Sequence, residues 1–260
     1  DYLAQAADYL VIGHRQLEQP SLQHANPLQA YADYRASEAG GGFTIFLLRI
    51  EELYDQFSYG ERTPLAVTEF LKAYYPMHRP KYLLLTGRAM APFAQTWQGD
   101  TAVFYRNHPQ AFEFQELVPA GGFPFSDKAY LMELDPMRPG LPAFSVGRIP
   151  AKNAQQLADY LAKVMEKDSL QLTSGWPSRV LHLSGGMNPR ERERHSSFLE
   201  GFAELALAKD VDPGVTVRSY AKQAATEVEP INLSQEINAG IALLTFFGHG
   251  SAAYNELDFG

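Results

Sequence analysis

The sequence predicts an α/β fold with two tandem, doubly wound and mainly parallel sheets. Short apolar runs with little alternation recur along the chain, as expected for parallel strands that helices cover on both faces. Segments with helical periodicity lie between these runs, and this alternation is typical of doubly wound sheets. The chain has 260 residues, 45% of them apolar, which is enough for one or two domains with a sizeable core.

Seven short segments rich in apolar or β-branched residues are expected to form the strands. They are residues 9–12, 43–48, 82–85, 144–146, 180–183, 215–217 and 241–247. The last of them is an unbroken run of apolar residues and one Thr, so we expect it to be buried on both faces.

Four segments between these runs are expected to form helices, namely residues 27–38, 64–75, 153–167 and 190–208. Pro64 suits the first turn of the second helix, where its missing N–H costs nothing. In the third, Leu157, Leu161 and Val164 fall on one face. The run Glu191–Arg194 opens the fourth helix and is expected to form a solvated first turn.

Residues 97–142 interrupt the alternation of strands and helices. The stretch is rich in Pro, Gly and aromatic residues and contains two β-like runs, 102–105 and 112–114. We interpret it as a β-rich insertion. The predicted organisation is an N-terminal α/β subdomain with this insertion over residues 1–150, followed by a second α/β subdomain over residues 151–260.

Composition excludes several functions. The net charge is −8 and no cluster of Lys or Arg compensates for it, so the chain is a poor candidate for binding nucleic acid. No apolar run approaches the roughly 20 residues of a membrane-spanning helix. The chain has no cysteine. It begins at Asp1 without an initiator Met and stops at Gly260 in a loop-like stretch, so we expect a fragment of a longer protein.

The segment Gly248-His249-Gly250-Ser251 directly follows the run 241–247. Ligands of α/β folds bind at the carboxyl ends of parallel strands, and the glycines allow a sharp turn and a close approach of a substrate. His249 could therefore act as a general base, with the N–H groups that follow it stabilising an oxyanion. A turn that merely carries a polar ring is an equally good interpretation of these residues alone.

Other motifs are weaker. Residues 248–253 also fit G-x-G-x-x-A, the dinucleotide-binding pattern, but residues 254–260 do not look like the helix that this pattern requires. We therefore expect no cofactor. The patterns of serine hydrolases, zinc peptidases and P-loop proteins are absent. The remaining histidines have no metal-ligand spacing; they are His14, His24, His78, His108, His182 and His195.

Six segments together resemble the gingipain family of caspase-like cysteine peptidases. They occur in the family's order, span most of the chain, and comprise residues 50–60, 64–75, 80–87, 126–130, 146–150 and 245–251. The forms Phe-Ser-Tyr-Gly at residues 57–60 and Phe-Phe-Gly-His at residues 246–249 look closest to the sortase-like members of the type IX secretion system, the PorU type.

The resemblance implies a caspase-like fold and specific roles for two residues. His249 would be the catalytic general base and acid, and Gly250 would lend its N–H to the oxyanion hole. The nucleophilic Cys would lie on a further strand beyond residue 260. Some members also place a carboxylate after the strand that corresponds to residues 180–183. This sequence has Ser184-Gly185-Gly186-Met187 there, so the third catalytic residue stays open.

For function, the resemblance implies a cysteine endopeptidase that removes C-terminal sorting domains from secreted proteins and attaches the cargo to a surface lipopolysaccharide. The expected location is the extracellular face of the bacterial outer membrane or the medium. Expected partners are those secreted substrates and other type IX components. The alternative is an inactive relative that serves as a binding or assembly module. The 260 residues alone are expected to have no peptidase activity, because thiol catalysis needs a thiolate.

Overall fold

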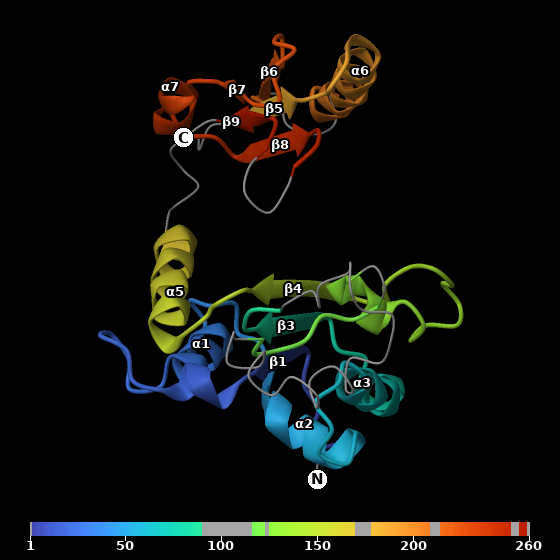
Figure 1. The fold of residues 1–260 in the computed structure, drawn as a ribbon. Helices are drawn as coiled ribbons and strands as arrows, with labels where there is room; N and C mark the ends of the chain where they lie inside the picture. The colour runs from blue at the N-terminus through green and yellow to red at the C-terminus, as the bar shows by residue number, and fades with distance from the viewer. Residues whose placement is uncertain are drawn as a thin grey trace. The chain divides into compact units, whose positions relative to one another are not determined.

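A computed structural model describes residues 2–89, 116–122, 125–169, 178–208, 214–250 and 255–258. The chain forms two compact units, residues 1–170 and residues 171–260, and each is built on a parallel sheet (Figure 1). The predicted α/β class with mainly parallel sheets is therefore confirmed.

The sheet of the first unit has four parallel strands in the order β2-β1-β3-β4. They are β1 (Tyr9–Gly13), β2 (Ile45–Arg49), β3 (Tyr82–Thr86) and β4 (Ser145–Ile149). From β1 the chain passes to β2 on one side and then to β3 on the other side. The carboxyl ends of β1 and β3 therefore form a topological switch point.

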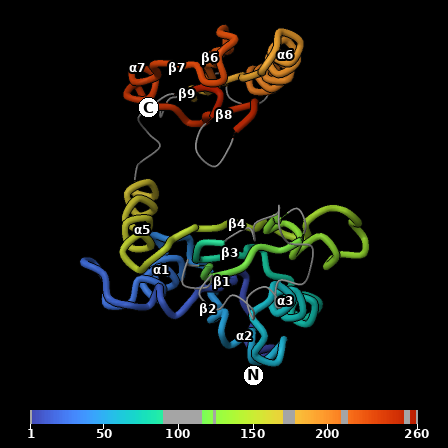
Figure 2. Tube along the Cα trace, viewed as in Figure 1, coloured from blue at the N-terminus to red at the C-terminus, as the bar shows by residue number. Residues whose placement is uncertain are grey.

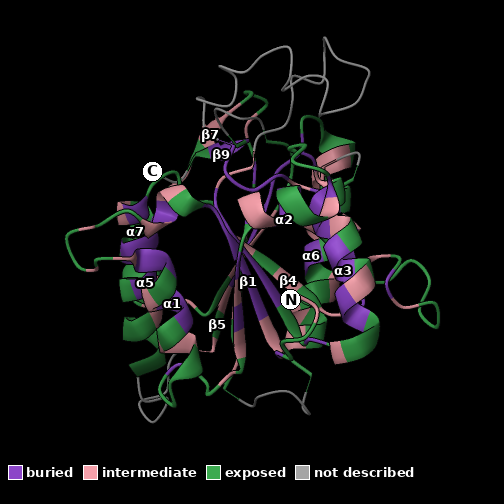
Figure 3. Cartoon of the chain, turned by 90° about the horizontal axis from the view of Figure 1, so that it is seen from below, coloured by how far each residue is buried: buried purple, intermediate pink, exposed green. Residues whose placement is uncertain are grey.

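Helices cover both faces of this sheet (Figure 2). They are α1 (Pro27–Ala36) and α5 (Ala154–Ser169) on one face, and α2 (Ile50–Phe57) and α3 (Leu65–His78) on the other. Val11 joins the core cluster of the first pair of helices, whereas Leu10 and Ile12 join that of the second. In Figure 3 the buried residues of β1 lie between these two layers. Both faces of the inner strands β1 and β3 thus need apolar side chains, which explains their continuous apolar runs.

The helix α5 belongs to the first unit. Its Leu157 and Leu161 join the core cluster that contains Leu28 of α1, and its Asp168 pairs with Arg35 at 3.0 Å. The sequence-based division near residue 150 assigned this helix to the second half. In the structure the two units divide at residue 170 instead.

Part of the predicted insertion over residues 97–142 can be traced. Its two β-like runs lie among residues 90–115, which are outside the described residues. The described remainder contains the short 3₁₀ helix η3 (Asp127–Leu131) and no strand. Arg148 of β4 pairs with Asp127 at 2.7 Å and so fixes η3 against the edge of the sheet.

The second unit has a three-stranded parallel sheet in the order β6-β5-β8. Its strands are β5 (Arg179–Ser184), β6 (Thr216–Ala221) and β8 (Leu243–Phe247), and a separate parallel pair is formed by β7 (Glu229–Pro230) and β9 (Leu257–Asp258). The described part of the unit also contains the helices α6 (Pro189–Ala206) and α7 (Ser234–Asn238).

Alternate residues of β5 face different neighbours. His182 bonds through Nδ1 to the Leu199 carbonyl of α6 at 3.1 Å, and Ser184 bonds to Ser196 of α6 at 3.0 Å. Leu181 and Leu183 instead join an apolar cluster with Leu233 and Leu257. The central strand of this sheet is therefore covered on both faces.

The expectation that the last strand is buried on both faces was wrong. Leu243 and Phe247 of β8 are exposed, and the three residues between them are only half-buried. The reason is its position, because within the described part of the chain β8 pairs only with β5 and forms the edge of the sheet. Its predicted strand conformation and parallel direction are confirmed. None of the described helices has the length and apolar character needed to span a membrane.

Candidate active site

His249 lies just beyond the carboxyl end of β8. Because Phe247 pairs with Ser184 of β5 in parallel register, His249 reaches the same edge of the sheet as the loop that leaves β5. Its side chain is 57% exposed. The expected position of His249 at the carboxyl end of a parallel strand is therefore confirmed.

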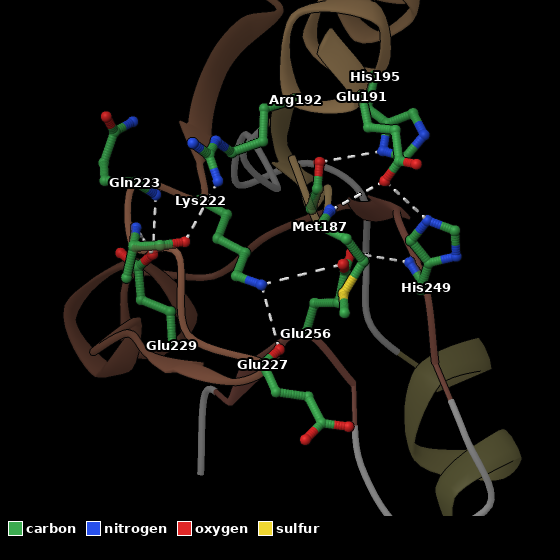
Figure 4. A network of polar contacts seen from close by, with 12 residues as sticks. Met187, Glu191, Arg192, His195, Lys222, Gln223, Glu227, Glu229, His249 and Glu256 are labelled. Carbon is green, nitrogen blue, oxygen red and sulfur yellow. Dashed lines mark hydrogen bonds and ion pairs between the residues drawn. The ribbon is translucent and has the colours of Figure 1, made fainter. Parts of the chain in front are cut away.

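The His249 ring faces a carboxylate from the first turn of α6 (Figure 4). Its Nε2 lies 3.2 Å from Oε2 of Glu191. Glu191 is held in place by the start of its helix: the Asn188 side chain accepts the Glu191 N–H at 3.0 Å, and Glu191 Oε2 accepts the Met187 N–H at 2.9 Å. This reciprocal cap satisfies two N–H groups at the helix start and fixes the carboxylate in front of the histidine.

The charge on Glu191 determines which ring nitrogen is basic. The N–H of Met187, and after it the bond to His249, hold the pKa of Glu191 below its usual range. An ionised carboxylate only accepts hydrogen bonds, so Nε2 of a neutral His249 carries the proton and Nδ1 keeps its lone pair. No described residue bonds to Nδ1, which is therefore the nitrogen available to take a proton.

A second histidine, His195 of α6, packs beside His249 at this edge of the sheet. His195 is buried, and its Nδ1 lies 3.0 Å from the carbonyl oxygen of Gly185. Its ring packs edge-on against Phe247 with 4.9 Å between centroids, and 5.8 Å separate it from the ring of His249. Aromatic contacts of this kind restrict where the His249 ring can lie.

Gly250 is exposed and faces Asn255 across an isolated antiparallel bridge. Its N–H donates to no described residue. Its predicted role in an oxyanion hole stays a prediction.

Comparison with known proteins assigns the chain to a protein family. Residues 2–258 match the model of peptidase family C25. The chain belongs to this family. C25 is the gingipain family, so the resemblance inferred from six sequence segments is confirmed. No curated protein shows significant similarity to the chain.

A solved structure also resembles this C25 member. It is dimeric latent PorU from Porphyromonas gingivalis, with 16% sequence identity and a TM-score of 0.43. The alignment covers 61% of this chain and 15% of PorU, so the matched part is a small fraction of that protein's length.

The structure corrects the prediction made for the run Glu191–Arg194. It does form the first turn of a helix, but Glu191 is bonded to His249 and Met187 rather than simply solvated. A carboxylate thus lies beside His249, and it comes from the first turn of α6 rather than from residues 184–187. The spacing Asn188-x-x-Glu191 is a capping-box pattern and could have located it from the sequence.

The dinucleotide pattern at residues 248–253 requires a helix directly after it. Instead, Asn255 pairs with Gly250 and residues 257–258 form β9. Among the described residues, no three or more His, Asp or Glu side chains are grouped as metal ligands would be.

A cavity of about 480 Å³ lies elsewhere in the second unit, lined by the first residues of β5 and β6 and by α7. Its lining includes Arg179, Thr216 and Ile241, at the amino ends of the strands. Because His249 follows the carboxyl end of β8, this cavity is not part of the candidate active site.

Proposed function

We propose that the chain is part of a thiol peptidase of family C25 in which His249 is the general base and acid. The observation that carries this proposal is the exposure and hydrogen bonding of the His249 imidazole. His249 is exposed at the carboxyl edge of a parallel sheet, its Nε2 is held by Glu191 at 3.2 Å, and its Nδ1 has no partner among the described residues. A catalytic base needs this combination of one oriented nitrogen and one open nitrogen.

The proposed reaction is acyl transfer through a thioester. Nδ1 of His249 takes the proton of the thiol, and the thiolate attacks the carbonyl carbon of the scissile bond. The imidazolium is stabilised by Glu191 and gives its proton to the leaving amine as the carbon–nitrogen bond breaks. The Gly250 N–H stabilises the oxyanion in this proposal. The 260 residues contain no cysteine, so in this proposal the thiol belongs to a residue outside them.

The finer proposal is a sortase of the type IX secretion system. Its substrates would be secreted proteins with C-terminal sorting domains, and it would act at the extracellular face of the outer membrane beside other components of that system. Membership of family C25 and the resemblance of residues 57–60 and 246–249 to the sortase-like members support this assignment. An inactive relative that binds or assembles components is the alternative.

The deciding experiment compares histidine variants of the full-length protein. With a peptide that contains the junction before a sorting domain, His249→Ala is expected to lower kcat/KM at least about a thousandfold. His24→Ala, in a loop of the first unit, is the control and should leave kcat/KM within twofold. Equal activity of His249→Ala and the unmodified protein would contradict the proposed role of His249. A full-length protein that folds, cannot cleave the peptide and still binds it would favour the inactive alternative.

Product analysis separates a sortase from a plain peptidase. With an added amine acceptor, a sortase yields the carboxyl-side fragment plus an amide of the acceptor, whereas a peptidase yields a free carboxylate. Hydrolysis alone, at every acceptor concentration, would remove the sortase assignment and leave the peptidase proposal standing.

A further inference from the structure

A second carboxylate lies beneath the backbone of the candidate catalytic residue. Glu256 is only 1% exposed, and its Oε2 accepts the His249 N–H at 2.8 Å. The backbone N–H of Glu256 donates to the His249 carbonyl oxygen at 3.2 Å. One residue therefore binds both backbone groups of His249, as the close-up view shows for the side chain (Figure 4).

The ends of all three strands of the sheet surround this carboxylate. Gly185 follows β5, Lys222 follows β6 and Gly248 follows β8. A Cβ atom added to Gly185 would lie 2.1 Å from Glu256 Oε2, and one added to Gly248 would lie 2.8 Å from it. Only glycine leaves room for the carboxylate at these two positions, so the loops after β5 and β8 are shaped around Glu256.

The charge of Glu256 is balanced by a buried lysine. Nζ of Lys222, which is 2% exposed, lies 3.9 Å from Glu256 Oε1 and donates to the Glu227 carbonyl at 3.1 Å. The Lys222 backbone N–H donates to the Ser184 carbonyl at 2.8 Å, which fixes where the side chain starts. An opposite charge thus lies beside the buried carboxylate that accepts the His249 N–H.

Burying the charged side chains of Glu256 and Lys222 is expected to destabilise the fold relative to apolar side chains of similar size. Glu256 Oε1 has no hydrogen-bond partner among the described residues. Buried charges with incomplete hydrogen bonding destabilise a fold, and apolar residues of similar size are often at least as stable in their place. Packing alone therefore does not account for Glu256 and Lys222.

We propose that Glu256 is a positioning residue for His249. By holding both backbone groups of residue 249, it fixes the origin of the imidazole so that Nε2 meets Glu191 and Nδ1 faces the reacting thiol. Because Glu256 accepts the His249 N–H, that N–H cannot serve as the oxyanion donor, a role that the proposed function gives to Gly250. The inference rests on the proposed function of His249 and adds a residue that does not touch the substrate.

The test uses two double variants of the full-length protein that differ only in the hydrogen-bond acceptor. Lys222→Met with Glu256→Gln removes both buried charges but keeps a side-chain oxygen for the His249 N–H. Lys222→Met with Glu256→Leu removes both charges and the acceptor. Neither leaves an unpaired buried charge, so both are expected to fold. The matched control is Glu229→Gln, whose carboxylate accepts backbone N–H groups of Gln223 and Ala224 and does not contact His249.

We expect the glutamine double variant to keep kcat within about fivefold of the unmodified protein. The leucine double variant should lose about a hundredfold in kcat with KM changed less than twofold, since displacements of about 1 Å in catalytic groups have effects of this size. Equal kcat values for the two double variants would overturn the proposal. A loss that appears in KM and not in kcat would overturn it as well.

A measurement that needs no activity separates this inference from the proposed function. The ¹⁵N–¹H signal of the His249 amide reports its hydrogen bond directly. It should stay in place in the glutamine double variant and move upfield in proton shift in the leucine one. Should His249→Ala retain full activity while this signal behaves as expected, the proposed function fails and the backbone contact stands. Should His249→Ala abolish activity while both double variants keep the unmodified kcat, only the positioning role fails.

Discussion

Two strand ends of this chain carry the same dipeptide, Gly-His, in different surroundings. In the first unit Gly13 ends β1 and His14 follows it, and in the second unit Gly248 and His249 follow β8. In both, Nε2 of the histidine meets a glutamate in the first turn of a helix. The distances are 3.1 Å from His14 to Glu51 of α2 and 3.2 Å from His249 to Glu191 of α6.

The two His–Glu pairs differ in the exposure of the histidine and in whether its Nδ1 has a hydrogen-bond partner. The His14 side chain is 11% exposed, whereas that of His249 is 57% exposed. Nδ1 of His14 accepts the Gln16 N–H at 3.0 Å and so caps the short helix η1 (Arg15–Glu18), whereas Nδ1 of His249 has no described partner. A His–Glu pair is thus a structural cap when both nitrogens are bonded and buried. It is a candidate base when one nitrogen is open and accessible.

The largest expected effect separates the two glutamates. Glu191→Gln should lower kcat/KM of the full-length protein about a hundredfold, because an amide cannot stabilise the imidazolium by charge and can donate to Nε2, which favours the wrong tautomer. Glu51→Gln should leave kcat/KM within twofold. The measurement is steady-state peptide cleavage by each variant.

The control for the Glu191 variant is Glu193→Gln, an exposed carboxylate on the same helical turn that contacts neither histidine. It should behave like the unmodified protein. A similar loss of kcat/KM in Glu51→Gln and Glu191→Gln would show that the two His–Glu pairs do not differ in their effect on catalysis.

The next largest effect concerns stability, and here the pair in the first unit is expected to show the larger change. His14→Ala should lower the free energy of unfolding of the first unit by about 2 kcal/mol, because Glu51 loses a donor and the Gln16 N–H loses its acceptor in a partly buried place. His249→Ala should change the stability of its own unit by less than about 0.5 kcal/mol, as exposed substitutions usually do. Hydrogen exchange of the β1 and β8 amides measures the two units separately. Greater destabilisation by His249→Ala than by His14→Ala would contradict the structural role given to His14 and the candidate catalytic role given to His249.

The pH dependence of stability sharpens the same contrast. Burial lowers the pKa of His14, and the smaller opposing effect of Glu51 does not restore it. The folded state therefore prefers the neutral ring. The contribution to stability is complete above the unfolded pKa of about 6.5 and is lost as pH falls from there to the lower folded pKa. Each tenfold difference in proton affinity between the folded and unfolded states corresponds to about 1.4 kcal/mol of this contribution.

His14→Gln provides the comparison for that pH effect. Between pH 7.5 and 5.5, the free energy of unfolding of the first unit should fall more steeply in the unmodified protein than in His14→Gln. Denaturant titrations at a series of pH values give both slopes. Parallel slopes would show that the buried ring does not change its protonation on unfolding.

The sequence predicted strands more reliably than it predicted burial. Strands such as β1 are recognisable because both of their faces need apolar side chains, and this requirement is visible in the run itself. β8 has an equally apolar run but lies at the edge of its sheet in the described part of the chain, and an edge position depends on pairing that no single run encodes. The helix α2 was not predicted as such, since Ile50 follows Arg49 of β2 without a linker.

The candidate site was predictable only in part. The glycine-flanked position of His249 after an apolar run marked it from the sequence. Its partner Glu191 lies 58 residues away and meets it only because β5 and β8 are neighbours in parallel register. Glu256 is seven residues from His249, but nothing in its local pattern indicates a buried carboxylate. The pairing of His14 with Glu51 was missed for the same topological reason.

The smallest expected effect uses a second matched pair, the two helices that begin with Asn-Pro. The side chain of Asn26 accepts the Gln29 N–H at the start of α1, and that of Asn188 accepts the Glu191 N–H at the start of α6, both at 3.0 Å. Alanine at either position should cost about 1 kcal/mol of stability, the usual value for a lost N-cap.

Only the second cap bears on the proposed chemistry, because the residue that Asn188 binds is the one that orients His249. Asn188→Ala should therefore also lower kcat a few fold at a temperature where both variants are fully folded, whereas Asn26→Ala should leave kcat unchanged. Asn188→Asp keeps an oxygen acceptor for the Glu191 N–H and should recover most of that loss. If both alanine variants lower kcat equally, the effect is one of general stability. The cap would then support the helix without positioning the carboxylate.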